Sequence, residues 1–243
     1  MPQFFIKSSQ FIGNRCIIEG DDYHHLVRAR RVGIDDEIYL RIEDGTLFCG
    51  KIIEIKNSSL IVEVIDRMGK RNSILNLTMY IGLLKGKKFS FVIQKLVEIG
   101  VKRIFPLVTE RTIPVIVDER KRKHDRWNRI ALEAAKQSMR DDVPIVENIT
   151  NYRDIVSNVT SGLRIIAHPS DNCMAFNNFL LDADKEYDVS LLIGPEGGFS
   201  RSEVDYAKGY GWENLNFGFT TLKAETAAIV LPAILFFEWN RRD

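Results

Sequence analysis

Residues 189–200 read Val-Ser-Leu-Leu-Ile-Gly-Pro-Glu-Gly-Gly-Phe-Ser, and they say more about the fold than any other stretch of this chain. The apolar run at the start has the length and the residue types of a strand buried in a core. It is followed by three glycines, Gly194, Gly197 and Gly198. Without a Cβ atom, these residues allow backbone angles and close approach that other residues forbid. Ser200 and Glu203 then have the spacing of a capping box, which predicts that a helix follows Ser200.

The glycine-rich corner is predicted to bind a ligand, but not through phosphate groups. It contains neither G-x-G-x-x-G nor G-x-x-x-x-G-K-[ST], and Glu196 stands where a phosphate site needs neutral amides or a lysine. A carboxylate among backbone amides better suits a ligand with hydroxyl groups, an amine or a positive centre. The alternative is a tight structural turn with an exposed glutamate, the ordinary meaning of an isolated Gly-Gly pair.

A second corner of the same kind lies near the C-terminus, where residues 217–228 read Phe-Gly-Phe-Thr-Thr-Leu-Lys-Ala-Glu-Thr-Ala-Ala. A short strand, a polar bend and a long apolar helix ending near Trp239 are predicted there, with Pro232 expected to kink the helix. Ligands of open α/β sheets bind where such corners meet at one edge of the sheet. We therefore expect the two corners to form one site.

The first 72 residues are predicted to form a small β-barrel. Short strands alternate with turns at 37–42, 47–55 and 60–65, with Asp44-Gly45 as a hairpin turn. A helix is expected from about Asp22 to Val32. Apolar periodicity stops from Met68 to Ser73, which is therefore the predicted linker. This divides the chain into domains of 1–72 and 73–243.

The second domain is predicted to be α/β with a mostly parallel sheet. Strands are expected at 75–83, 104–107, 163–167 and 189–193, separated by helices after Lys88, from about 120 to 139, and after Thr221. The first of these helices is expected to end at Gly100 and to bury one apolar face: Phe89, Val92, Ile93, Leu96 and Val97. Periodicity alone predicts a Rossmann-like arrangement, because knots are almost absent from proteins.

Five motifs follow one another over nearly the whole chain. They are His24-His25-Leu26 with Arg28 and Gly33; Gln94-Lys95-x-x-Glu98-x-Gly100-Val101; Trp127 through Glu133-Ala134, Gln137-Ser138, Arg140 and Val143-Pro144; Ile193 to Ser200 with Glu203; and Leu222 to Ala227. Together they resemble the bacterial small-subunit (16S) ribosomal RNA uracil-N3 methyltransferases of the SPOUT superfamily. The resemblance implies an α/β fold with a C-terminal trefoil knot and a PUA-like N-terminal β-barrel that binds RNA.

The resemblance also implies S-adenosylmethionine (SAM) as the cofactor, held by loops of the knot. Glycines would let the backbone press against the adenine and ribose, and apolar side chains would supply the walls. His168 alone would be read as an ordinary loop histidine. The residues assigned to the cofactor are Ala167, His168, Pro169, Leu192, Ile193, Gly194, Glu196, Gly197, Gly198, Phe217, Gly218, Leu222 and Thr226.

The implied reaction is methyl transfer to N3 of a uridine, which must be unpaired or flipped out because N3 lies inside a base pair. N3 has to lose its proton while negative charge spreads onto the carbonyl oxygens, so a carboxylate and a cation are useful. The candidate catalytic residues are Glu196, Arg140, Lys223 and Glu225, with Gln137 as a further polar candidate.

Two of these candidates carry a qualification of their own. For Glu225, the alternative is an ordinary acidic residue in the first turn of a helix. Lys223 departs from the family pattern, in which arginine usually stands before the Glu-Thr-Ala run, and lysine lacks the planar fork of a guanidinium.

Basic residues gather in several clusters although the formal net charge is only +1. Such clusters favour a surface that follows the phosphates of small-subunit ribosomal RNA. The residues expected to contact RNA are Arg28, Arg31, Lys88, Arg126 and Arg140. The alternative for any one cluster is a solvated charged face. The family resemblance also implies a homodimer, and the last helix is apolar enough to bury against a partner.

The three cysteines, Cys16, Cys49 and Cys173, are scattered without a CxxC pair. This argues against a disulfide framework or a zinc site and for a reducing compartment. We therefore expect no metal and a cytoplasmic location. The opening residues lack the plan of a signal peptide, and no apolar run is long enough to span a bilayer, so no membrane partner is expected.

Two other functions remain open at this point. One is a nucleotide-dependent oxidoreductase on a doubly wound sheet, which the missing dinucleotide fingerprint disfavours. The other is a non-catalytic RNA-binding protein, which would keep the basic clusters and the barrel but would not bind SAM.

Overall fold

The computed structural model describes residues 3–69, 75–112, 117–169, 174–175, 188–216 and 220–241, with the side chains of 117–119 and 174–175 outside the description. The contacts divide the chain into two compact units. The first comprises Met1–Asn72 and Ala135–Asp142, and the second Ser73–Ala134 and Val143–Asp243. Most of the predicted linker, residues 70–73, lies outside the described residues.

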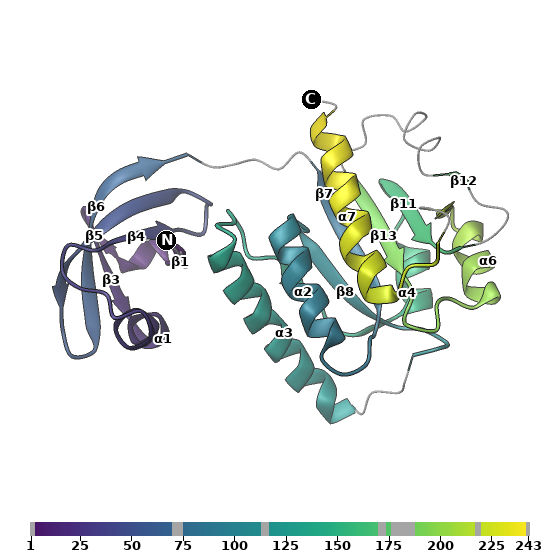
Figure 1. Cartoon of the computed structure of the whole chain (residues 1–243), viewed down its shortest axis with the longest axis horizontal. Coiled ribbons are helices and arrows are strands. Elements are labelled where there is room, and N and C mark those ends of the chain that lie inside the picture. Colours follow the sequence, from purple (N-terminus) through teal and green to yellow (C-terminus); the bar gives the residue numbers. More distant parts are fainter. Residues whose placement is uncertain are drawn as a thin grey trace. The chain divides into compact units, whose positions relative to one another are not determined.

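The first unit contains a six-stranded sheet in the order β1-β4-β5-β6-β3-β2 (Figure 1). Its elements are β1 (Gln3–Phe5), η1 (Ser8–Gln10), β2 (Phe11–Ile12), β3 (Arg15–Glu19), α1 (Gly20–His24), η2 (His25–Ala29), β4 (Glu37–Arg41), β5 (Leu47–Ile55) and β6 (Ser59–Met68). All neighbours are antiparallel except β1 and β4. The strands predicted in this part of the sequence are confirmed. The sheet is curled, and among the described residues no pairing joins β1 to β2 to close a barrel.

The helix predicted from Asp22 to Val32 is wrong in its bounds. The structure has a short α-helix, α1, followed by the π-helical turn η2, which ends at Ala29. Gly20 begins this segment with a φ of 66°, and Arg31 closes it with a φ of 53°. A left-handed residue cannot continue a right-handed helix, so Arg31 stops the segment earlier than the apolar pattern suggests.

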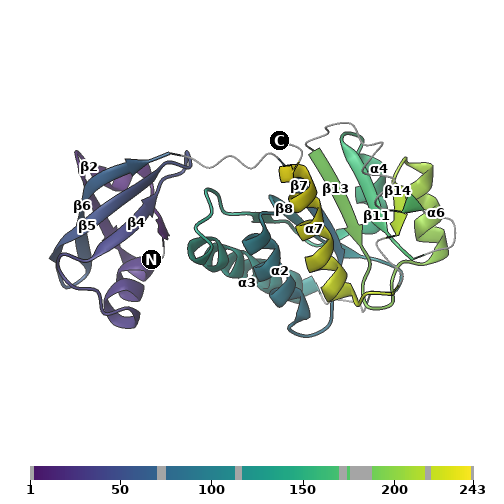
Figure 2. The same cartoon turned by 45° about the horizontal axis from the view of Figure 1, so that its top comes forward.

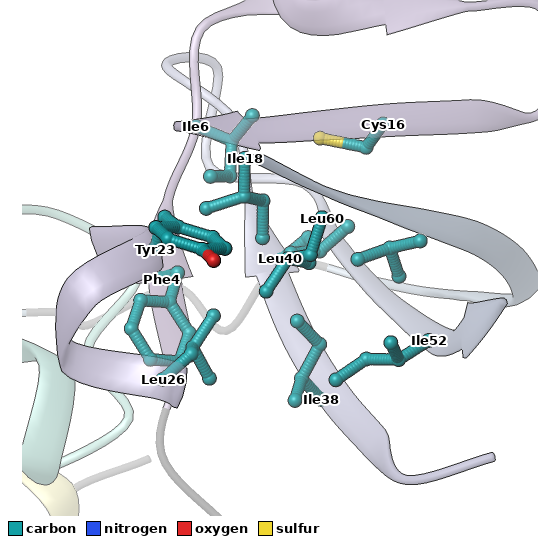
Figure 3. Close-up of a cluster of buried hydrophobic side chains, with 11 residues drawn as sticks. Phe4, Ile6, Cys16, Ile18, Tyr23, Leu26, Ile38, Leu40, Ile52 and Leu60 are labelled. Carbon is teal, nitrogen blue, oxygen red and sulfur yellow. The ribbon is translucent and has the colours of Figure 1, made fainter. Parts of the chain in front are cut away.

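One hydrophobic core lies inside the curled sheet (Figure 3). Alternate residues of the strands point into it, as expected for a sheet with one buried face. Tyr23 and Leu26 of the helical segment complete it, and the Tyr23 hydroxyl donates to the Lys56 carbonyl at 2.7 Å. The strand residues of this core include Cys16, Ile18, Ile38, Leu40, Ile52 and Leu60.

Residues 135–142 belong to the first unit because polar contacts tie them to its strands and helix. Lys136 Nζ lies 2.6 Å from an Asp22 carboxylate oxygen, and the buried Arg41 guanidinium lies 2.8 Å from Asp141. Gln3 donates to the Ala135 carbonyl at 3.3 Å. The sequence placed this segment in the second domain.

The second unit is built on a sheet with the strand order β10-β8-β7-β13-β11-β14-β12, with β9 beside β8. All of these pairings are parallel, which confirms the predicted α/β class. The strands are β7 (Asn76–Gly82), β8 (Arg103–Val108), β9 (Ile145–Val146), β10 (Thr150–Asn151), β11 (Leu163–Ala167), β12 (Met174–Ala175), β13 (Asp188–Ile193) and β14 (Glu213–Asn216). The helices are α2 (Lys88–Ile99), α3 (Val117–Gln137, which ends in the first unit), α4 (Tyr152–Asn158), α6 (Arg201–Gly209) and α7 (Ala224–Arg241).

Helices cover both faces of this sheet. Helices α2 and α7 lie side by side on one face, while α4 and α6 pack together on the other (Figures 1 and 2). The five apolar residues predicted to be buried on α2 are at most 1% exposed. Gly100 ends α2 with a φ of 121°, and a Cβ there would lie only 3.1 Å from the Phe236 ring of α7. The pattern of α2 therefore identified its buried face correctly.

Candidate active site

The glycine-rich corner between β13 and α6 packs its backbone tightly. A Cβ on Gly194 would lie 3.0 Å from Gly198, and one on Gly82, at the end of β7, would lie 2.5 Å from Pro195. The Gly198 amide donates to the Pro195 carbonyl at 2.8 Å, which closes the turn. Gly198 has a φ of +66°, a left-handed angle that glycine adopts without penalty.

The capping box predicted at the start of α6 is confirmed. The Ser200 hydroxyl accepts the Glu203 amide at 3.1 Å, and the Glu203 carboxylate accepts the Ser200 amide at 2.9 Å. The second carboxylate oxygen of Glu203 accepts the Glu110 amide at 2.9 Å. Glu203 is only 2% exposed, so these bonds satisfy a buried charge and fix the corner to the loop after β8.

A pocket lies at the carboxyl ends of β11 and β14, the edge at which parallel sheets bind ligands. Residues 194–198 of the glycine-rich corner are not among those that line it. Four of its lining residues, Ala167, His168, Pro169 and Leu222, are among those assigned to the cofactor. The sequence did not assign the other six, although Thr220, Thr221 and Ala227 belong to the second corner. They are Leu215, Asn216, Thr220, Thr221, Ala227 and Leu231.

Leu192, Ile193 and Thr226 were also assigned to the cofactor, but they are not among the residues that line this pocket. Leu192 is buried in the core against α4 and α6, and Ile193 is 2% exposed at the end of β13. Thr226 is exposed in the first turn of α7. Phe217 and Gly218 lie outside the described residues.

Arg111 supports the corner and was not found from the sequence. Its guanidinium donates to the Gly197 carbonyl at 2.6 Å. Burial lowers the pKa of His168, and the positive charges of Arg111 and Lys208 lower it further, so the imidazole is neutral near pH 7. No motif of the chain marks Arg111, which follows β8 far from the corner in sequence.

Three charged side chains meet where α2, the corner after β13, and α7 come together. Lys88 Nζ lies 3.1 Å from Glu225 Oε1 and 3.6 Å from Glu196 Oε1. Glu196 Oε1 also accepts the Lys85 amide at 2.9 Å. We call Lys88, Glu196 and Glu225 the charged cluster. The structure thus brings together two of the predicted catalytic carboxylates through a lysine that the sequence assigned to RNA.

The two partners of the main ion pair hold each other in the charged state. A hydrogen bond to Glu225 raises the pKa of Lys88 above its ordinary value. The pKa of Glu225 is lowered, first by its own backbone amide at the start of α7 and then by Lys88. Lys88 is therefore protonated and Glu225 ionised at neutral pH.

The other predicted site residues are placed as follows. Arg140 belongs to the first unit, is 9% exposed, and its guanidinium donates to Asp142 at 2.7 Å. Arg28, Arg31 and Gln137 are exposed in the same unit, and Arg126 is exposed on α3. Lys223 is exposed just before α7.

Trp127 packs rather than lying open for stacking. It is 5% exposed, and its ring centroid lies 4.6 Å from that of Phe89. Trp127 is therefore a packing residue and does not offer its face to a base.

Within the described ranges, no group of three or more His, Cys, Asp or Glu side chains is arranged to hold a metal ion. The same ranges contain no helix that is both long and apolar enough to cross a membrane.

Comparison with known proteins assigns both parts of the chain. A family model described as an RNA methyltransferase domain matches residues 70–236, and one described as an RNA methyltransferase PUA domain matches residues 18–65. A protein of Borreliella burgdorferi, ribosomal RNA small subunit methyltransferase E 2, is 30% identical over 94% of both chains. A ribosomal RNA small subunit methyltransferase E of Mesomycoplasma hyopneumoniae is 28% identical over 95% of this chain and 97% of its own.

Solved structures agree with these sequence relatives. A ribosomal RNA small subunit methyltransferase E from Neisseria gonorrhoeae, crystallised with S-adenosyl methionine, superposes with a TM-score of 0.88. It is 25% identical and aligns over 98% of each chain. A methyltransferase from Legionella pneumophila in complex with SAM gives a TM-score of 0.85 at 26% identity over 96% of each chain.

Proposed function

This chain belongs to the RNA methyltransferase family, and on that premise we propose that it transfers a methyl group from SAM to N3 of a uridine in small-subunit (16S) ribosomal RNA. The observation that carries the proposal is the pocket at the carboxyl ends of β11 and β14, together with the charged cluster, in which two carboxylates face one lysine. Such a site suits a ligand with a positive centre and no phosphate. The sequence relatives are named for the same substrate class.

The residues at the pocket fit SAM. In the neighbouring segment after β13, Gly194 allows the tight packing of the corner's backbone and Gly198 its left-handed angle. Leu215, Leu222 and Leu231 supply apolar surface for an adenine, and Asn216, Thr220 and Thr221 supply polar groups for a ribose. A neutral His168 adds a hydrogen-bonding group without adding positive charge next to a sulfonium.

SAM supplies an activated methyl group, whose S–C bond breaks with the electron pair staying on sulfur. The protein's task is to present uracil N3 and to receive the N3 proton. Glu196, Glu225, Lys223 and Arg140 are the side chains we propose for this task, with the carboxylates as acceptors and the cations facing the carbonyl oxygens.

The RNA would be bound mainly by exposed basic residues. Arg28 and Arg31 lie on the first unit, whose sequence matches a PUA domain model, and Arg126 lies on α3. Contacts of this kind grip phosphates and fix the orientation of the RNA without reading its sequence. Because ribosomal RNA is the proposed substrate, the reaction would take place in the cytoplasm.

We also propose that the second unit carries the C-terminal trefoil knot of the SPOUT superfamily and pairs as a homodimer. Support for the knot is the return of the chain after β14, at the far side of the sheet, to pack α7 against α2 and β13. Support for the dimer is apolar surface on these two helices, where Phe237 is 66% and Phe91 49% exposed. Sedimentation equilibrium would give twice the chain mass, and Phe237→Glu would shift the equilibrium towards the monomer.

Calorimetry with SAM, NAD and a small-subunit RNA fragment separates the proposal from its two rivals. The proposed enzyme binds SAM and RNA. A nucleotide-dependent oxidoreductase binds NAD instead of SAM, and a non-catalytic RNA-binding protein binds RNA alone. Failure to bind SAM would reject the proposed activity.

A further inference from the structure

Lys88 occupies a position that is unfavourable for a lysine. It is the first residue of α2, where the positive end of the helix dipole disfavours a cation. Its side chain is 45% exposed, and ion pairs that are open to solvent contribute little to stability. Stability therefore does not explain why this side chain is placed between Glu225 and Glu196.

Glu225 uses only one of its two carboxylate oxygens. Oε1 faces Lys88, whereas Oε2 is buried and has no hydrogen-bond partner among the described residues. Buried carboxylate oxygens are normally hydrogen-bonded, because an unpaired one costs free energy. A donor supplied by a bound substrate would satisfy Oε2.

Glu196 is engaged differently. Its Oε1 accepts the Lys85 amide and faces Lys88, so it holds the turn before α2 against the corner after β13. This side chain joins two segments of the site, while Glu225 keeps an unused acceptor. The two carboxylates therefore have different tasks, and Lys88 is the group that contacts both.

We propose that Lys88 is a positioning residue for methyl transfer, holding Glu225 through Oε1 so that Oε2 accepts the N3 proton of the substrate uracil. The inference rests on the proposed function and deepens it, because it chooses between the two carboxylates. In the step, the N3–H electron pair becomes available to bond the methyl carbon, the S–C pair stays on sulfur, and the proton passes to Glu225 Oε2 and then to solvent.

Another role for Lys88, the one expected from the sequence, is contact with an RNA phosphate. The two roles differ in what changes when the charge is removed. Removal of a phosphate contact would weaken RNA binding and lower its salt dependence. Removal of a positioning residue would lower the rate of transfer at saturating SAM and RNA, and would change how that rate depends on pH.

The test compares Lys88→Met, Lys88→Arg, Glu225→Gln and the double variant Lys88→Met/Glu225→Gln in single-turnover methylation of small-subunit RNA. Lys88→Met should lower the rate roughly 10- to 100-fold, less than the full contribution of about 10²–10⁴ from a positioned proton acceptor, because the acceptor itself is kept, and SAM affinity should be unchanged. Lys88→Arg should restore most of the rate. The double variant should be no slower than Glu225→Gln, because both changes disable the same acceptor.

The pH profile gives a readout that a purely structural role would not move. Lys88 lowers the pKa of Glu225, so its removal raises that pKa. Activity that needs ionised Glu225 is lost as pH falls through the pKa, and Lys88→Met should therefore lose activity at a higher pH than the parent. Lys95→Met is the matched control, since Lys95 pairs with Glu98 on the surface of the same helix. It should keep the parental rate and profile.

Several results would overturn the inference. One is a parental methylation rate for Lys88→Met, and another is a double variant whose rate reduction is the product of the two single reductions. A third is a loss of activity at low pH that occurs at the same pH in Lys88→Met as in the parent. The last is a defect confined to RNA affinity, with a smaller dependence of RNA binding on salt. A parent protein that neither binds SAM nor methylates RNA would instead reject the proposed function, and that result is seen before any variant is made.

Discussion

Gly198 shows how much a single residue at the corner reveals about the site. The sequence predicted that the glycines of this corner allow backbone angles and close approach that other residues forbid. The structure places no heavy atom within 4 Å of such a Cβ, but it gives Gly198 a φ of +66°. The requirement for glycine at this position is therefore one of backbone angle rather than of close approach within the protein.

Gly198→Ala should accordingly cost about 1–2 kcal/mol of folding stability, the penalty of a left-handed angle for an L-residue. If the corner relaxes to avoid the strain, SAM affinity should fall as well. Gly209→Ala is the control, because Gly209 also has open space around its Cβ but no positive φ. Thermal unfolding and SAM calorimetry check both variants. Equal effects of the two changes would remove the special role of Gly198.

Lys223 stands close to Glu225 and contributes to lowering its pKa. If the site needs positive potential near the uracil oxygens, Lys223→Arg should keep activity and Lys223→Ala should lose much of it. Single-turnover methylation with saturating SAM measures the difference. An alanine variant as fast as the parent would mean that Lys223 only solvates the helix start, where its charge is mildly unfavourable.

Part of the candidate site could be predicted from the sequence because its residues lie in continuous motifs. Glu196 and Leu222 are of this kind. Lys88 and Arg111 act through contacts with residues more than eighty positions away, and no local pattern carries that information. This is why Lys88 was assigned to RNA and Arg111 was not noticed.

At the scale of elements, helices and strands were predicted correctly where the apolar periodicity agreed with the sequence signals at the ends of the element. Strands β5 and β11 have the predicted bounds, and α6 begins with the predicted capping box. The segment 20–29 differs because its α-helix passes into a π-helical turn and a left-handed arginine ends it. The pattern of apolar side chains does not show where the backbone hydrogen bonds of a helix change from the α-helical to the π-helical spacing.

The capping box of α6 also leads to a stability prediction. Ser200→Ala removes the acceptor for the Glu203 amide and should cost about 1 kcal/mol. Ser157→Ala in α4 is the control, since the Ser157 hydroxyl donates back to the carbonyls of Arg153 and Asp154 in its own helix. Denaturant unfolding would compare them. A destabilisation at Ser157 as large as that at Ser200 would contradict the capping role.

At the scale of the whole molecule, the fold class followed from the alternation of strands and helices. The assignment of 135–142 to the first unit did not, because it depends on ion pairs such as Lys136 with Asp22. The spacing of apolar residues along the chain likewise gives no information about the knot or the homodimer. Both describe how distant segments or separate chains meet, and both remain proposals.

RNA binding by the first unit can be tested through its dependence on salt. Reversing Arg28 and Arg31 to Glu together should weaken binding and lower the salt slope by roughly 0.7–0.9 for each phosphate that the protein no longer neutralises. SAM affinity should be unchanged. Lys51 and Lys56 reversed together are the control, because the charge change is the same and both pair with neighbouring carboxylates. If the two double variants behave alike, Arg28 and Arg31 form only a solvated face.

The central claim is that this chain methylates N3 of a uridine in small-subunit ribosomal RNA. The most direct measurement incubates the purified chain with SAM carrying an isotopically labelled methyl group and with small subunits or their RNA. The RNA is then digested to nucleosides for mass spectrometry. We expect labelled 3-methyluridine that disappears when Glu225→Gln replaces the parent. Label in another nucleoside, or no label although SAM is bound, would contradict the claim.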